Sequence, residues 1–154
     1  MYGNGQTARG ACAIKPHPLM VLLIDDDRCV RSLLAAILNR EGLAYELACD
    51  GTEAIALLRR RDYDAVVLDL LLPGRNGFDV LRFLKAERPH MLARVVVISA
   101  AMESTLSAFD DRARVAAVLR KPFDIIELSA AVRKAMPARS GAGTPPSTAR
   151  SPSR

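Results

Sequence analysis

Two short apolar runs in this sequence each end in acidic residues. Asp25 and Asp26 follow the run 20–24, and Asp69 follows the run 65–68. If both runs are buried parallel strands, their carboxyl ends open on the same edge of a sheet. The three carboxylates should then meet in the crevice where open α/β sheets bind ligands. They require a divalent cation or a proton, because three like charges cannot all stay ionised in a low-dielectric cleft.

The oxygen atoms of these side chains favour one cation in particular. Mg²⁺ keeps several waters and typically binds one or two carboxylates together with a phosphate oxygen. Asp25, Asp26 and Asp69 therefore indicate a magnesium site that supports phosphoryl chemistry.

The elements that must position these residues follow from the hydrophobic pattern. Short apolar runs alternate with helical patterns five times. We expect strands at 20–24, 44–48, 65–68, 95–98 and 115–119. We expect helices at about 28–40, from 50–52 to 59–61, and at about 77–87, 104–112 and 124–135. This alternation predicts an α/β fold with a doubly wound, five-stranded parallel sheet. The strand order 2-1-3-4-5 fits best, because 44–48 alternates like an edge strand while the first, third and fourth strands are fully apolar.

Composition places one domain between two terminal segments. Half of the 154 residues are hydrophobic, which is enough for a single core. The formal charge of +5 comes from the ends: 1–18 and 137–154 hold five basic residues and no acid, so the domain at 19–136 is neutral. We expect 1–18 to be a flexible extension and 137–154 to be a disordered basic tail rich in Ser, Pro and Arg, because neither can bury apolar surface. Five scattered cations argue against nucleic-acid binding.

The cysteines and the hydropathy pattern indicate a soluble protein of the cytoplasm. Cys12, Cys29 and Cys49 fit no metal-ligand spacing, and Cys29 and Cys49 fall in segments that we expect to be packed. Reduced thiols are therefore expected. No apolar run reaches the roughly 20 residues that a membrane span needs, so no membrane association is expected.

Four motifs together resemble the receiver domain of two-component response regulators over residues 19–136. They are Ile24-Asp25-Asp26-Asp27, Leu68-Asp69-Leu70-Leu71-Leu72-Pro73-Gly74-Arg75-Asn76-Gly77, Ile98-Ser99-Ala100 and Leu119-Arg120-Lys121-Pro122-Phe123. Each motif alone is weak, and their order at the ends of successive strands carries the resemblance.

The resemblance implies a role for each site residue. Asp69 is expected to be the nucleophile that accepts a phosphoryl group from a phosphohistidine. Asp25, Asp26, Asp69 and the backbone carbonyl of Leu71 would hold Mg²⁺. Lys121, after a cis Lys-Pro bond, would supply a cation to the phosphoryl oxygens, and Ser99 would be the switch hydroxyl. Asp27 is expected to cap the first helix.

The expected function is that of a single-domain response regulator, which is not an enzyme beyond its own phosphotransfer and dephosphorylation. Its partners would be a sensor histidine kinase or phosphotransfer protein and an unknown downstream protein. We expect no sequence-specific nucleic-acid contact, because no helix-turn-helix segment flanks the domain.

An interaction scaffold that signals without phosphate remains the alternative. Val118 stands where the family usually has an aromatic switch residue, and Arg114-Val115 replaces the usual Gly-Ala. A metal-dependent phosphatase with an aspartyl intermediate is disfavoured, because such enzymes have a second acid two residues after the nucleophile and this position is Leu71 here. A dinucleotide-binding fold is disfavoured because no Gly-rich turn follows the first strand.

Overall fold

The fold is an α/β sandwich built around one parallel sheet. The structure is a computed structural model that describes residues 18–100 and 114–138. The strands are β1 (Met20–Ile24), β2 (Ala44–Ala48), β3 (Ala65–Asp69), β4 (Val95–Ser99) and β5 (Ala117–Arg120). The helices are α1 (Arg28–Arg40), α2 (Gly51–Arg60), α3 (Gly77–Glu87), the 3₁₀ helix η1 (Pro89–Arg94) and α5 (Ile125–Ala135). All strands are parallel in the order β2-β1-β3-β4-β5, which confirms the predicted fold class and order.

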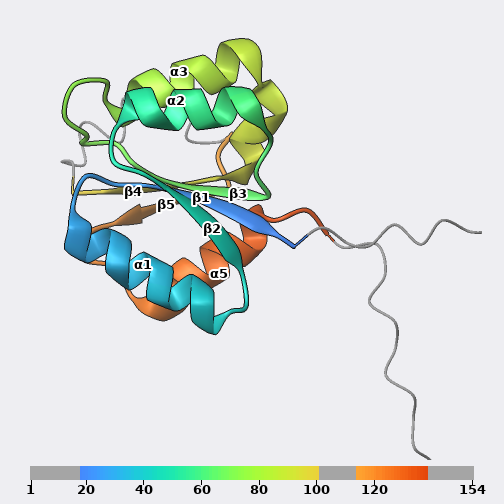
Figure 1. The fold of residues 1–154 in the computed structure, drawn as a ribbon. Helices are drawn as coiled ribbons and strands as arrows, with labels where there is room; N and C mark the ends of the chain where they lie inside the picture. The colour runs from blue at the N-terminus through green and yellow to red at the C-terminus, as the bar shows by residue number, and fades with distance from the viewer. Residues whose placement is uncertain (1–17, 101–113, 139–154) are drawn as a thin grey trace, which may run out of the picture.

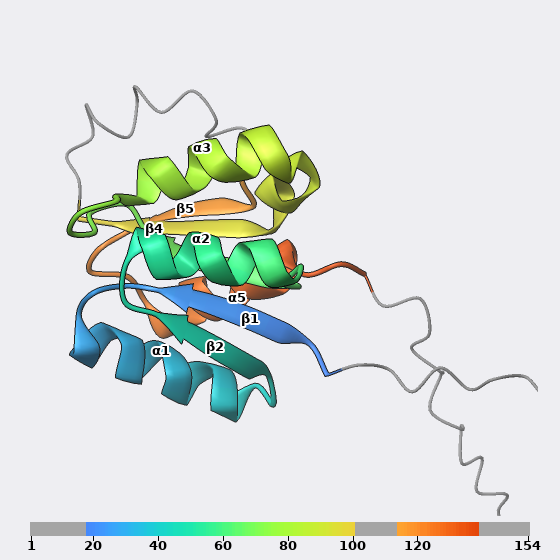
Figure 2. The same cartoon turned by 45° about the horizontal axis from the view of Figure 1, so that its top comes forward.

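The helices cover the sheet on both faces. Figures 1 and 2 show α1 and α5 on one face and α2 and α3 on the other. Alternate residues of β1 therefore enter different cores: Leu22 and Ile24 pack on the α2–α3 side, and Val21 and Leu23 pack on the α1–α5 side. Every residue of β3 and β4 is buried, as expected for continuous apolar runs between two helical layers.

Acidic and amide side chains begin the helices, as the turn chemistry predicts. Asp27 accepts hydrogen bonds from the backbone N–H groups of Cys29 and Val30, which confirms its expected capping role. Asp50 accepts from the N–H of Glu53 at the start of α2. Asn76 and Asp124 form capping boxes at α3 and α5.

The structure departs from the sequence-based expectations at three places. The last strand begins at Ala117 instead of Val115, because Val96 and Ala117 start the pairing register with β4. The 3₁₀ helix η1 was not predicted. Pro89 indicates the end of a helix, but here it also occupies the first turn of the next one. Cys29 and Cys49 are free thiols. Cys29 lies in α1, a packed segment as expected, but its side chain is exposed, and Cys49 is exposed in the turn after β2.

Some expectations fall outside the described residues. These are the helix at about 104–112, the flexibility of nearly all of 1–18 and the disorder of 139–154. Within the described part of the chain, the helices are all too short or too polar to cross a bilayer.

Candidate functional site

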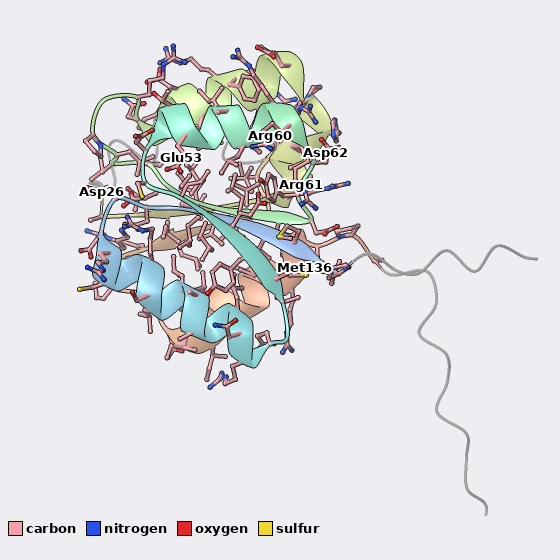
Figure 3. The ribbon with its side chains drawn as sticks, in the orientation of Figure 1. Asp26, Glu53, Arg60, Arg61, Asp62 and Met136 are labelled. Carbon is pink, nitrogen blue, oxygen red and sulfur yellow. The ribbon has the colours of Figure 1, made fainter. Side chains whose placement is uncertain are left out.

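The carboxyl ends of β1 and β3 bring three acidic side chains together. Asp25, Asp26 and Asp69 each offer one oxygen, and these oxygens lie within 4.8 Å of one another. Asp25 is fully buried and Asp69 is 4% exposed, whereas Asp26 is exposed. Figure 3 shows Asp26 at the end of the sheet opposite Arg61 and Asp62. The three residues therefore form an acidic pocket with one solvent-facing member.

Lys121 enters this pocket from the loop after β5. Its Nζ donates to Asp25 Oδ2 at 2.8 Å and to Asp69 Oδ2 at 2.6 Å. The peptide bond between Lys121 and Pro122 is cis, as the resemblance implies. An ammonium group thus balances part of the negative charge, a third possibility beside the proton and the metal that the sequence alone suggested.

The protein environment also affects the protonation of these groups. Burial raises the pKa of Asp25 above its ordinary value of 3.8, although hydrogen bonds from Lys121 and from the Asp27 N–H act in the opposite direction. Burial alone would lower the pKa of Lys121, but its bonds to Asp25 and Asp69 outweigh burial and raise it. Lys121 therefore remains an ammonium at neutral pH.

Backbone groups fix the orientation of both buried carboxylates. The N–H of Leu71 donates to Asp69 Oδ1 at 2.9 Å, and the N–H of Asp27 donates to Asp25 Oδ1 at 2.8 Å. Each carboxylate consequently has one oxygen held by its own chain segment and the other held by Lys121.

Ser99 lies at the end of the neighbouring strand. It is fully buried as the last residue of β4, and its carbonyl accepts a 2.9 Å hydrogen bond from the Lys121 N–H. Within the sheet, Asp69 pairs in register with Ile98, the residue before Ser99. The fold therefore gathers all six residues named from the sequence at one edge of the sheet.

Two further residues support the site, and sequence reasoning assigned neither of them a role there. Arg31 donates from Nη1 to the carbonyl of Asp25 at 2.7 Å, but it looks like any polar residue of an amphipathic helix. At Gly77, a Cβ would lie 2.4 Å from the carbonyl oxygen of Asp69 and 2.6 Å from Leu70 Cα. Only glycine allows α3 to begin this close to the strand that carries Asp69.

Sequence comparison agrees with this geometry. The model of the response regulator receiver domain matches residues 21–133. The transcriptional regulatory protein TcrA of Mycobacterium tuberculosis is 34% identical over 113 residues, which are 73% of this chain and 44% of TcrA. Sporulation initiation phosphotransferase F of Bacillus subtilis is 30% identical over 120 residues, which are 78% of this chain and 95% of that protein.

Solved structures give the same result. TrrA from Thermotoga maritima, a response regulator crystallised in complex with Mg(2+)-BeF, superposes with a TM-score of 0.66 at 27% identity, covering 77% of this chain and 99% of that chain. The receiver domain of the Francisella response regulator 1452 gives a TM-score of 0.67 at 28% identity and covers 77% of this chain and 96% of that chain. The chain spans half or less of the length of the first curated relatives that it matches. With a family match over most of its length and the acidic pocket at the expected strand ends, the chain belongs to the response regulator receiver domain family.

Proposed function

We propose that this chain is a phosphorylation switch in two-component signalling. A histidine kinase or a phosphotransfer protein would donate a phosphoryl group to the carboxylate of Asp69, and the phosphorylated form would bind a downstream protein differently. The observation that carries the proposal is the position of Asp69: a nearly buried carboxylate, held by the Leu71 N–H and by Lys121, beside two further carboxylates. We place the reaction in the cytoplasm, since Cys29 and Cys49 are unpaired thiols, the state that a reducing compartment maintains.

The chemistry of the step follows from that position. An oxygen of Asp69 attacks the phosphorus of the phosphohistidine, a P–O bond forms as the P–N bond breaks, and the imidazole leaves with a proton. A carboxylate needs no general base for this attack, so the protein's main task is to position it and to neutralise charge. The Leu71 N–H supports this task because it fixes the rotation of the Asp69 carboxylate.

The acidic pocket fits a magnesium ion. All of its candidate ligand atoms are oxygens. Asp25 is buried and has lost its hydration, so a bound cation would stabilise its negative charge where water cannot. Asp25, Asp26, Asp69 and the carbonyl of Leu71 would hold the ion, with Asp25 acting through a water. When bound, Mg²⁺ supplies positive charge to the oxygens of the transferred group.

Lys121 and Ser99 are proposed to stabilise the phosphorylated state. Moving a two-state equilibrium from 1:99 to 99:1 takes about 5.5 kcal/mol. A hydrogen bond to a charged group contributes roughly 1.5–3 kcal/mol. The Lys121 ammonium and the Ser99 hydroxyl together could therefore drive the switch, whereas neither could do so alone.

Intact mass spectrometry tests the proposal. The protein is incubated with magnesium and acetyl phosphate, beside Asp69→Asn and the matched variant Asp62→Asn, which alters an acid at the opposite end of the sheet. The parent and Asp62→Asn should each gain one phosphoryl group, and Asp69→Asn should gain none. Labelling of Asp69→Asn would show that the nucleophile is misassigned.

A phosphate-independent scaffold is the second candidate. It is favoured by Val118, a half-buried aliphatic residue of β5 at the position where the family resemblance leads us to expect an aromatic switch residue. A parent protein that binds magnesium but accepts phosphate from neither acetyl phosphate nor a phosphorylated histidine phosphotransfer domain would favour the scaffold.

A further inference from the structure

The strand β2 forms an open edge of the sheet. It is the first strand in the sheet order and pairs only with β1 among the described strands. Figure 2 shows it at the rim of the sheet, between α1 on one side and α2 on the other. The Ala44 N–H donates to the Leu19 carbonyl and the Asp25 N–H donates to the Ala48 carbonyl. Because backbone groups alternate in direction along a strand, the N–H and C=O groups of Tyr45 and Leu47 point away from β1.

A groove runs along each face of this edge, and each groove contains two arginines. The groove on the α1 face is lined by Arg28, Arg31, Ser32, Ala35, Tyr45 and Leu47. The groove on the α2 face is lined by Glu46, Leu57, Arg60, Arg61 and Tyr63. The side chains of β2 thus alternate between the two grooves, as the pleat of a strand requires.

The charges in the two grooves differ. On the α1 face no acid lines the groove, and neither Arg28 nor Arg31 forms an ion pair with a described residue; Arg31 instead donates to the carbonyl of Asp25. On the α2 face Glu46 accepts a hydrogen bond from the Tyr63 hydroxyl and offsets one of the two arginines. Arg61 also stacks over the Tyr63 ring, 5.4 Å from its centroid, next to the apolar Leu57.

We propose that the β2 edge binds an extended segment of a partner protein in which acidic and apolar residues alternate. The segment would add a sixth strand beside β2, with its backbone paired to Tyr45 and Leu47. Its acidic side chains enter the α1-face groove near Arg28 and Arg31. Its apolar side chains enter the α2-face groove beside Leu57 and the Arg61 side chain, which lies over the buried Tyr63 ring.

Charge disfavours both terminal segments and a second copy of the chain as occupants of this edge. Residues 1–18 and 137–154 contain five basic residues and no acid, so neither terminal segment complements the arginines. A second copy that paired β2 with β2 would bring the arginines of both copies together, and such repulsion disfavours association. An acidic partner has no such cost.

A peptide-binding assay tests this proposal. The probe is a fluorescent peptide of alternating Glu and Val, about eight residues long, which is enough to pair with a five-residue strand. Two control peptides have Lys in place of Glu or have the same composition in separate blocks of Glu and Val. Fluorescence anisotropy should show binding of the alternating peptide and at least about fivefold weaker binding of both controls. Equal binding of the block peptide would overturn strand addition.

Matched variants locate the surface. Arg28→Glu should weaken binding by about fivefold or more, and Arg40→Glu, the same change on the α5 side of α1, should alter it less than about twofold. Leu47→Pro removes an outward N–H at a strand edge that tolerates proline, and it should abolish binding while far-UV circular dichroism stays native. Equal effects of Arg28→Glu and Arg40→Glu would mean that the peptide responds only to the net charge of the protein, and this would overturn the proposal.

Two controls distinguish peptide binding at β2 from self-association of the protein and from its phosphorylation. Sedimentation of the free protein that shows a dimer disrupted by Leu47→Pro would mean that β2 binds a second copy, which would also overturn the proposal. The assay contains no phosphodonor, so its outcome is independent of the phosphorylation of Asp69.

Discussion

Replacing Lys121 with methionine removes the cation that joins Asp25 and Asp69. The methionine keeps most of the apolar stem, but the two carboxylates lose the 2.8 Å and 2.6 Å contacts with Nζ. Asp25 has no exposed side-chain surface and the Asp69 side chain is only 6% exposed, so water cannot replace the ammonium fully. Breaking a buried pair by removal of one partner typically costs about 3–5 kcal/mol.

Protonation sets an upper limit to this cost. The variant can neutralise one carboxyl with a proton, and for a carboxyl with an ordinary pKa of 3.8 this costs about 4.4 kcal/mol at pH 7, at 1.36 kcal/mol for each pH unit. The same limit is about 1.6 kcal/mol at pH 5. Because the Lys121 side chain is 20% exposed in the parent, we expect a loss of about 2–4 kcal/mol at pH 7 and less than about 1.6 kcal/mol at pH 5.

The direction of the pH effect follows from linkage. A carboxyl whose folded pKa is raised makes the folded state bind more protons than the unfolded state, so stability falls as pH rises from 3.8 through the folded pKa. The parent lysine, with its raised pKa, contributes fully below its ordinary value of 10.5 and is constant over this range. Loss of Lys121 removes contacts that lower the pKa of Asp25, so this pKa is raised further in the variant than in the parent. The deficit of the variant should therefore grow from pH 5 to pH 7.

Urea unfolding in EDTA at both pH values measures this deficit. Lys134→Met, at an exposed position in the last turn of α5, is the control and should stay within about 0.5 kcal/mol of the parent. Magnesium in place of EDTA should reduce the deficit, because a cation again balances the carboxylates. A loss below about 1 kcal/mol at pH 7, or one that does not depend on pH, would refute the reasoning.

Three further predictions concern single contacts. Gly77→Ala should lower stability by about 1–3 kcal/mol and slow phosphorylation, because its Cβ would overlap the backbone of Asp69; thermal unfolding and the mass assay measure both. Asp50→Ala should cost about 1 kcal/mol in urea, since the α2 N-terminus loses its cap, and an unchanged midpoint would contradict this. The hydrogen bond from His90 and, secondarily, the Arg88 pair lower the pKa of Asp62, so the stability that they add is present above pH 3.8 and is lost as pH falls through the lower folded pKa. Asp62→Asn should remove less than about 1 kcal/mol at pH 6, where the exposed pair is screened, and NMR titration of the parent carboxyl checks the direction of the shift.

Several features were decided by local sequence and were predictable for that reason. Strand β1 and helix α1 have the predicted bounds, because an apolar run and a 3.6-residue period each specify one kind of element. Asp27 was expected as a cap, since an Asp before such a period satisfies the free N–H groups of the first turn. The parallel order followed from handedness and from the alternating pattern of the edge strand β2.

The meeting of the three acids was also predictable, since parallel strands end on one edge of the sheet. The start of β5 was not predictable, because the pairing with β4 begins at Ala117 although Val115 is more apolar and also buried. The exposure of Cys49 was hidden as well, because local pattern does not show which turn residues face water.

The family resemblance implied that Lys121 serves the site, but its bonds to Asp25 and Asp69 were decided by the tertiary structure alone. Lys121 is separated from Asp25 by 96 positions and from Asp69 by 52, so no local pattern relates their charges. The same holds for Arg31, which reaches the carbonyl of Asp25 only because α1 packs against the end of β1. Hydrophobic periodicity determined which elements form and where the acids lie. The balance of charge among those acids depends on distances of a few ångströms, and only packing of the complete sheet sets those distances.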